Sequence, residues 1–391
     1  MPVQWTKEQE QVIHLTNRNI LVSAAAGSGK TAVLVERILT MMTRQENPVD
    51  IDRLLIVTFT RAAAGEMRER LAAAVERRLQ EEPDNEHLQR QQTLIHNAQI
   101  NTIDGFCSYV IRNYFHTIDL DPGFRTASEG ELKLLKTDVV QEVLEAAYAR
   151  GEERYHQFVE SFSAGKTDEG LGDMILRLYE FSMSNPWPEE WLNQCRIPYE
   201  AEDFSQLQES AWMRMLWEDA GRDLAEADWV LTENEELTGQ EDGPHTYEEA
   251  ARADRMLLDA LWDLWRQRDF DGLAGTFDQM KFAALSRKKD PEASEEKKEA
   301  FKMGRDRFKE ILKDLKERYF YGNSEEIMEE LAVCRGPVEE LIDLTLEFMR
   351  AFAEKKRQKN LVDFSDMEHF ALEILVKRGE DGSLQYTEAA V

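Results

Sequence analysis

Cysteine is scarce in this chain of 391 residues, which has only Cys107, Cys195 and Cys334. These residues lie far apart, so they form neither a metal-ligand spacing nor a disulfide framework. Such usage predicts a reducing, cytoplasmic compartment. No apolar run is long enough to cross a bilayer, and the N-terminus lacks the basic segment and apolar core of a secretory signal. We therefore expect no role at a membrane.

Basic residues are also few, since 48 Lys and Arg face 77 Asp and Glu, for a net charge of −29. The imbalance is uneven: residues 1–125 carry a net charge of −2, and residues 126–391 carry −27. This bulk acidity argues against a protein that coats nucleic acid nonspecifically. It still allows a local basic track on an acidic body.

What the chain does have is a phosphate-binding loop near its start. Residues 20–22 are predicted to be an apolar strand, and a helix is predicted over 32–39. Between them lies the loop, which consists of Ser23, Ala24, Ala25, Ala26, Gly27, Ser28, Gly29, Lys30 and Thr31. A strand, a small-residue loop and Gly-Lys-Thr at a helix start form the context that a nucleotide-phosphate cradle needs.

Each conspicuous residue of the loop has a physical role in that chemistry. Gly27 and Gly29 let the backbone curl so that N–H groups point at phosphate oxygens. Lys30 would reach the terminal phosphates, and the Thr31 hydroxyl would ligate Mg²⁺. These two are the candidate catalytic residues, with ATP and Mg²⁺ as the expected cofactors. One departure from the usual pattern is Ala24, which stands where glycine is common.

Two more strands are predicted, over 54–58 and 98–103, and each runs into a helix. The alternation predicts an α/β fold whose parallel sheet, with few strands, is incomplete within these residues. A turn-rich segment over 119–125 marks a boundary, beyond which the pattern is helical almost throughout.

In the helical part, apolar residues recur at helical spacing along one stripe, which consists of Met213, Leu216, Trp217, Ala220, Leu224 and Ala227. Most of the tryptophans fall between 187 and 265, where core packing is the favoured use and a ligand-stacking surface is the alternative. Loops are expected over 232–247 and 286–299.

Two basic tracks, over 281–318 and 354–359, have two interpretations each. Either track could contact a phosphate backbone. The alternative, which the charge pattern favours, is a solvated helix face with ion pairs between neighbouring turns, such as around Glu310, Lys313 and Asp314. Gln9 also has two interpretations, because its amide could cap a helix together with Thr6 or could form hydrogen bonds with an adenine edge.

These motifs together resemble UvrD-like superfamily-one helicases, and most closely the AddA-type subunits of bacterial AddAB helicase/nucleases. The resemblance rests on Gln9, the phosphate loop and four further segments, which are 58–67, 102–106, 118–125 and 362–366. It covers the whole chain and is most specific up to Arg125.

The resemblance implies roles for single residues. Gln9 matches the glutamine that reads adenine. The DNA-binding positions would be Thr58, Phe59, Thr60, Arg61, Thr102 and Gly105, with the Phe59 ring available to stack on a base. Asp104 stands where the family usually has histidine, and a carboxylate would repel a phosphate, so only the Gly105 N–H is expected to contribute there.

The resemblance also implies an architecture. Residues 1–125 would be the start of a RecA-like ATP-binding motor domain, and residues 126–355 would be a helical insertion. Residues 356–391 would be a segment that returns to the motor domain and stops before the Asp-Glu box, the pair of acidic residues that handles Mg²⁺ and water in this family. The expected partners are DNA, single-stranded and duplex, and a second protein, AddB. The expected activity is ATP-driven translocation and unwinding in double-strand-break repair, with nuclease activity in a region beyond these residues.

Two other functional classes stay open at this point. A phosphate-loop kinase or other NTPase with a helical lid would ignore DNA. A scaffold would use the acidic helical body over 126–360 to dock a protein partner. The segment around Phe59 favours the helicase, because a phosphate loop alone does not require it.

Overall fold

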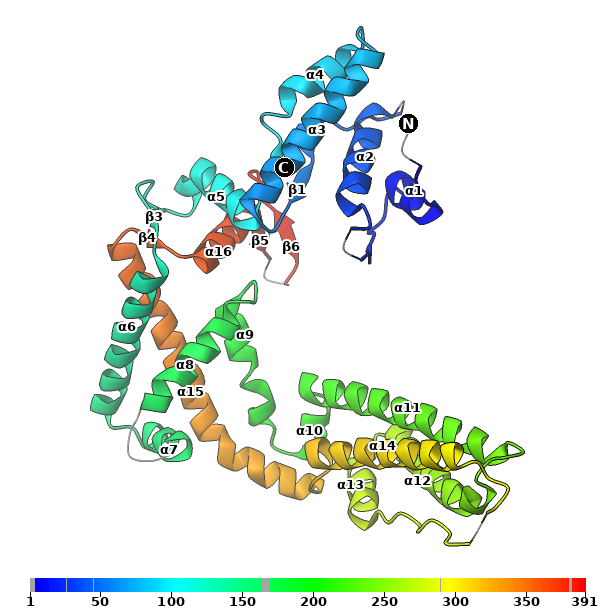
Figure 1. Cartoon of the computed structure of the whole chain (residues 1–391). Helices are drawn as coiled ribbons and strands as arrows, with labels where there is room; N and C mark the ends of the chain where they lie inside the picture. The colour runs from blue at the N-terminus through cyan, green and yellow to red at the C-terminus, as the bar shows by residue number, and fades with distance from the viewer. Residues whose placement is uncertain (1–3, 26, 45, 164–168, 289, 380–381) are drawn as a thin grey trace. The chain divides into compact units, whose positions relative to one another are not determined.

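The computed structural model describes residues 4–25, 27–44, 46–163, 169–288, 290–379 and 382–391. These residues are mostly helical, with three small two-stranded sheets among them (Figure 1). The chain divides into two compact units. The first comprises Met1–Leu135 and Ala353–Val391, and the second comprises Lys136–Phe352.

The first unit contains all the strands found among the described residues. Its helices are α1 (Lys7–His14), α2 (Lys30–Thr43), α3 (Arg61–Glu81), α4 (Glu86–Leu94), α5 (Ile103–Tyr114) and α16 (Phe364–Leu375), with short 3-10 turns at Ile51–Arg53 and Phe115–Thr117. Its strands are β1 (Leu55–Val57), β2 (Gln99–Asn101), β3 (Arg125–Thr126), β4 (Leu361–Val362), β5 (Val376–Arg378) and β6 (Leu384–Tyr386). It also holds the start of α6 (Glu129–Arg150) and the end of α15 (Ser324–Gln358).

Strands β1 and β2 form the parallel pair that the sequence predicts, in a register that places Ile56 beside Ile100. Both side chains are buried in a core shared with α2 and α3. This arrangement places the carboxyl ends of both strands at one edge, where helices α3 and α5 begin a few residues later.

The predicted strand over 20–22 is wrong for this structure, because the segment is an extended coil and Leu21 is fully exposed. A strand needs a neighbour to accept and donate its backbone hydrogen bonds. Strands β1 and β2 pair only with each other, so within the described residues no strand lies against 20–22.

A second core of the first unit lies between α5 and α16, which bury Ile111 and Met367 together with Val362. Strand β3 pairs in parallel with β4, from near the other end of the chain. Residues 353–391 are thus packed with the N-terminal part of the chain.

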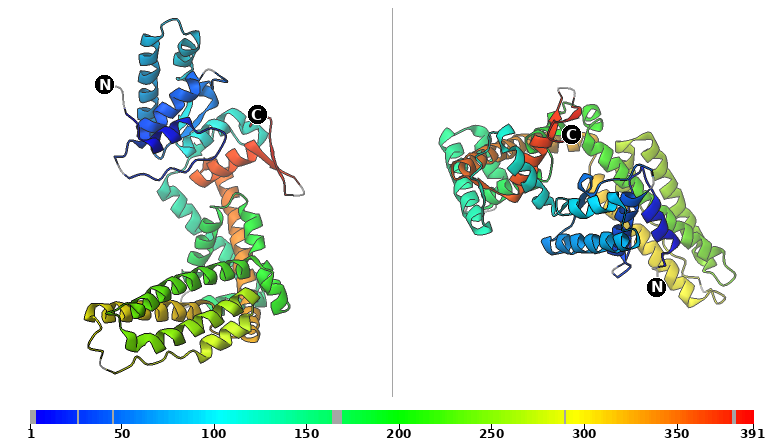
Figure 2. Two further views of the ribbon diagram at one scale, coloured as in Figure 1. Left: turned by 90° about the vertical axis from the view of Figure 1, so that its right-hand side faces the viewer. Right: turned by 90° about the horizontal axis from the view of Figure 1, so that it is seen from above.

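In its described residues, the second unit consists of helices and the coil segments that join them. It contains α7 (Glu153–Phe162), α8 (Glu169–Ser182), α9 (Pro188–Gln194), α10 (Phe204–Gln208), α11 (Ala211–Gly239), α12 (Glu248–Gln267), α13 (Phe270–Gln279) and α14 (Glu295–Tyr319), most of α6 and α15, and 3-10 turns at Ile197–Glu200 and His245–Tyr247. Figure 2 shows α11 in green and α14 in yellow as long helices that lie side by side.

The predicted apolar stripe is confirmed as the core face of α11. Trp217 and Leu224 on this face are buried, and they pack in one cluster with Phe277 and Phe320. Core packing is thus the use of Trp217, whereas Trp229 on the same helix is 62% exposed.

The two expected loops are partly wrong. Helix α11 continues to Gly239, into the first expected loop. Asn234 and Thr238 are polar, but both lie on the buried face of this helix. Helix α14 already begins at Glu295, inside the second expected loop.

Arg305 and Asp254 form a buried ion pair inside the second unit. Arg305 of α14 donates to both carboxylate oxygens of Asp254 on α12, at 2.6 and 3.0 Å, and to the Ala283 carbonyl at 2.7 Å. The side chains of Arg305 and Asp254 are only 3% and 2% exposed. The fork of hydrogen bonds compensates for the loss of water around both charges.

Candidate nucleotide and DNA site

The phosphate loop ends at a helix start that no side chain caps. Gly29 precedes α2 in the left-handed region, with φ of 80°, and no side chain caps the helix. Gly27 has φ of 78°. Glycine is needed at both positions because side chains resist this conformation. The first N–H groups of α2 therefore carry the partial positive charge that attracts phosphate. Ala26 lies outside the described residues.

The Lys30 ammonium is folded back onto the loop. It donates to the carbonyls of Ala24 at 2.6 Å and Ala25 at 2.9 Å. Both carbonyls belong to the loop itself, so the ammonium already lies over the cradle. To bind a phosphate, Lys30 would have to give up its hydrogen bonds to these carbonyls and donate to the phosphate oxygens instead. Thr31 follows in the first turn of α2 and is exposed, so its hydroxyl is accessible to a metal ion that accompanies a nucleotide.

Gln9 joins helix α1 to the loop. Its side chain accepts from the Thr6 N–H at 2.9 Å, and its own N–H donates to the Thr6 hydroxyl at 3.3 Å, so the predicted capping box is confirmed. The Gln9 amide nitrogen also donates to the Ser28 carbonyl at 3.2 Å. One amide N–H and one oxygen lone pair remain, which is what an adenine edge requires.

A hollow of about 560 Å³ lies between α1 and the loop. Val12, Val33 and Leu34 give it an apolar side, and Gln9 and Lys30 give it polar groups. An apolar wall beside convergent polar groups is typical of small-ligand sites. The hollow thus brings the predicted adenine and phosphate contacts together around one space.

The segment after β1 has the same form as the segment after β2. Thr60 accepts from the Ala63 N–H at 3.1 Å and so caps α3, while Thr102 accepts from the Gly105 N–H at 3.1 Å and caps α5. The Thr58 N–H donates to the Asn101 carbonyl at 3.0 Å, which ties the two strand ends together.

These predicted DNA contacts are exposed to different degrees. The Phe59 ring is fully exposed, at 102%, and Arg61 is exposed beside it. The Gly105 N–H is already engaged by Thr102, and Asp104 lies in the same first turn of α5. The exposed ring is therefore the group most free to meet a ligand.

The basic track over 354–359 contains a buried cation that the charge pattern did not reveal. Lys356 donates to Asp363 at 2.8 Å and to Asp366 at 2.6 Å, and its side chain is 4% exposed. Asp363 and Asp366 also form the capping box of α16. Burial raises the pKa of Asp366 above its ordinary value, while Lys356 opposes the rise. Lys356 thus has a structural role.

The basic track over 281–318 follows the ion-pair interpretation, although with different partners. Glu310 pairs with Arg307, and Lys313 pairs with Glu317. Other cations of the track pair with acids far away in the sequence, namely Arg305 with Asp254, Arg307 with Glu226, Lys316 with Asp278, Lys297 with Asp242, and Arg318 with Asp223. Lys289 lies outside the described residues.

Two negative findings apply to the described residues alone. Among them, no group of three or more His, Cys, Asp or Glu side chains is arranged to hold a metal ion. No helix in the same part of the chain combines the length and the apolar character that crossing a membrane demands.

Comparison with known proteins places these features in a family. Residues 5–389 match the model of the UvrD/REP helicase N-terminal domain. The AddA subunit of the ATP-dependent helicase/nuclease from Lachnoclostridium phytofermentans is 47% identical over 99% of this chain and 28% of that protein. The corresponding proteins from Acetivibrio thermocellus and Clostridium perfringens SM101 are 39% and 38% identical, over 99% and 100% of this chain and 31% of each relative. The chain thus spans less than a third of these relatives.

Proposed function

Since the chain belongs to the UvrD/REP helicase family, we propose that its first unit binds ATP with Mg²⁺ and contacts single-stranded DNA. In this proposal Lys30 and the N–H groups of residues 23–31 hold the phosphates, Thr31 ligates Mg²⁺, and Gln9 reads the adenine. Thr58, Phe59, Thr60, Arg61, Thr102 and Gly105 form the DNA-contact segments.

The observation that carries the proposal is the arrangement of Gln9, Lys30 and the open start of α2 around one hollow. A turn of small residues that binds no ligand would not need a glycine in the left-handed region at an uncapped helix start. It would also not need the hydrogen bond by which the Gln9 amide of α1 holds the loop at Ser28. The bound group would supply phosphate charge, and these residues would hold and orient it.

For the whole protein we propose an ATP-driven motor that moves along single-stranded DNA and unwinds duplex in the repair of double-strand breaks. It would act in the cytoplasm with the partner AddB and with nuclease activity outside these 391 residues. Residues 1–125 and 356–391 would belong to a RecA-like domain, with residues 126–355 inserted.

We also propose that the 391-residue chain binds ATP without hydrolysing it steadily. Phosphoryl transfer depends on positioning by a Mg²⁺-holding carboxylate and a charge-stabilising arginine as well as the phosphate loop. In the amino-acid sequence of residues 1–391, no run of apolar residues ends in the Asp-Glu pair that is typical of the family. Steady ATP hydrolysis stimulated by DNA, measured with this chain alone, would contradict this point.

Substitution of Lys30 tests nucleotide binding directly. In the 391-residue chain, Lys30→Ala should weaken binding of a fluorescent ATP analogue with Mg²⁺ by about 10-fold or more, because a charge-assisted hydrogen bond to phosphate is lost. Fluorescence anisotropy measures the affinity. Lys7→Ala is the matched control, since Lys7 is an exposed lysine on α1 outside the loop. Equal affinities of wild type and Lys30→Ala would refute the assignment.

The kinase-like alternative differs in its response to DNA. A small-molecule NTPase with a helical lid would hydrolyse ATP at the same rate with or without single-stranded DNA. In the full-length protein, the proposed motor should instead be stimulated by DNA, and Lys30→Ala should abolish that stimulation.

A further inference from the structure

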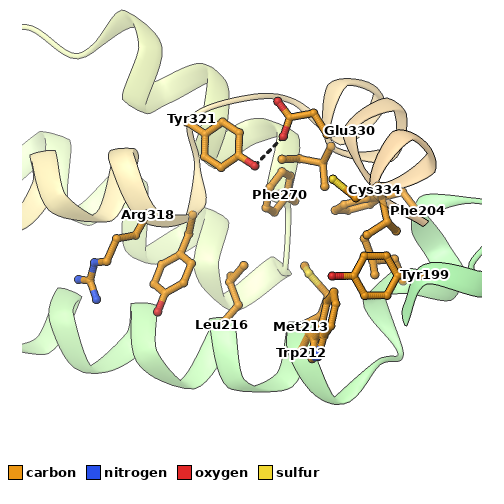
Figure 3. Close-up of a pocket in the computed structure, with 14 residues that line it drawn as sticks. Tyr199, Phe204, Trp212, Met213, Leu216, Phe270, Arg318, Tyr321, Glu330 and Cys334 are labelled. Atoms are coloured by element: carbon orange, nitrogen blue, oxygen red, sulfur yellow. Dashed lines mark hydrogen bonds between the residues drawn. The ribbon is translucent and has the colours of Figure 1, made fainter. Parts of the chain in front are cut away.

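An aromatic pocket lies within the second unit, and none of its lining residues is a predicted site residue. It is a hollow of about 290 Å³ between α10, α11, α13 and the start of α15 (Figure 3). Its aromatic lining consists of Tyr199, Phe204, Trp212, Phe270, Tyr319 and Tyr321.

The pocket has a buried floor and an exposed aromatic rim. Phe270 and Met213 on the floor are 3% and 4% exposed, whereas Trp212 and Tyr321 at the rim are 41% and 54% exposed. Tyr199 meets Trp212 edge to face, with ring centroids 5.0 Å apart. Exposed aromatic residues around a preformed hollow are typical of anchor sites in protein interfaces.

The charge inside the pocket is negative. Glu330 accepts a hydrogen bond from the Tyr321 hydroxyl at 2.9 Å, and Figure 3 shows both groups at the rim. Arg318 is the one cation among the lining residues. It forms an ion pair with Asp223, and its side chain points away from the hollow. The open carboxylate is therefore not neutralised from within the pocket.

From these observations we propose that the pocket receives a lysine or arginine side chain presented by a protein partner. Aromatic faces attract cations, and a carboxylate at the rim would pair with the charged head while the floor receives the aliphatic stem. Residues 136–352 contain 51 Asp and Glu against 27 Lys and Arg. A field of this sign draws a basic protein surface toward the pocket and repels DNA phosphates.

The test uses the 391-residue chain and an acetylated, amidated peptide of alternating glycine and arginine, with binding measured by calorimetry at about 0.1 M salt. Glu330→Gln and Trp212→Ala should each weaken binding about tenfold, as expected for a desolvated ion pair or cation–ring contact. Glu329→Gln and Trp229→Ala are matched controls, because Glu329 and Trp229 are exposed on the same helices and do not line the pocket. The controls should change binding by less than about twofold.

Three results would overturn the proposal. The peptide fails to bind the wild type, or the control variants lose as much affinity as the pocket variants, which would mean that charge alone attracts it. Binding of a dodecamer of thymidylate, to which Phe59 of the first unit should contribute, is weakened by Trp212→Ala and strengthened by Glu330→Gln, which would identify a base-stacking surface at the pocket. Circular dichroism checks that each variant folds. Tyr321→Phe removes only the hydroxyl that holds Glu330 and should weaken peptide binding without loss of structure.

Discussion

Phe59 is a residue whose side chain no packing explains. A buried phenylalanine stabilises a fold by about 1.5–3 kcal/mol, and the fully exposed Phe59 ring contributes none of this. Its neighbours are held firmly, since Thr58 donates to the Asn101 carbonyl and Thr60 caps α3. A rigid backbone that presents a bare ring suits stacking on a nucleic-acid base.

Replacement of Phe59 should therefore separate binding from stability. We expect Phe59→Ala to change the free energy of unfolding by less than about 0.5 kcal/mol, as exposed substitutions usually do. The same change should weaken binding of a thymidylate oligomer about tenfold, because each stacked base contributes about 1–3 kcal/mol. Urea unfolding and fluorescence anisotropy measure the two quantities.

Tyr386→Ala is the control for this experiment, since Tyr386 is another aromatic residue of the first unit and is 80% exposed. It should leave both quantities unchanged. If Phe59→Ala binds the oligomer as wild type does, the ring has no part in DNA binding and the proposed segment is wrong at its main residue.

At the scale of elements, the Lys356 cluster fastens the end of α15 to the start of α16. We expect Lys356→Met to reduce the free energy of unfolding by about 3 kcal/mol at neutral pH, because two buried carboxylates lose their cation. Lys359→Met is the control, since Lys359 is an exposed lysine in the same track. Urea unfolding of both variants measures the difference.

The pH dependence of that loss follows from the raised pKa of Asp366. A buried carboxyl with a raised pKa favours the folded state at low pH, and this contribution is lost as pH rises through the folded pKa. Without Lys356 the pKa rises further. The deficit of Lys356→Met relative to wild type should therefore shrink as pH falls from about 7 toward about 4, near the unfolded pKa. A deficit that is constant with pH would exclude the buried carboxylates as its cause.

Local patterns in the sequence predicted the elements that depend on local interactions. The phosphate loop is one short segment and strand β1 is a short apolar run, so both could be predicted. Residues 20–22 have the same apolar composition as β1 but lack a neighbouring strand, and the local sequence does not reveal whether a neighbour is present. The Gln9 contact with Ser28 was missed for the same reason, because its partner comes from another element.

At the scale of the whole molecule, the number of charges could be predicted from the sequence, whereas their partners could not. A count of residues identified the acidic part correctly, but the count could not tell which cations were neutralised. Arg318 pairs with Asp223 on α11, and Arg305 pairs with Asp254 on α12, so partners come from far along the chain. The basic tracks therefore looked available to phosphate in the sequence, although many of their cations are occupied.

Three core clusters of the described residues lie each within one unit, so we expect the stabilities of the two units to be separable. Arg305→Met leaves the Asp254 carboxylate unpaired in the second unit, and we expect it to destabilise that unit by about 3–5 kcal/mol. In calorimetry, the transition of the second unit should move to lower temperature. The transition of the first unit, identified because ATP with Mg²⁺ raises its midpoint, should stay in place.

The double variant Arg305→Met with Asp254→Leu decides whether the lost charge balance is the cause. Breaking one side of a buried pair leaves a desolvated charge, whereas replacing both partners by apolar groups of similar size removes that cost. The double variant should therefore recover most of the lost stability. If it is no more stable than Arg305→Met, the loss comes from packing around Arg305. If both transitions move together in either variant, the units do not unfold independently.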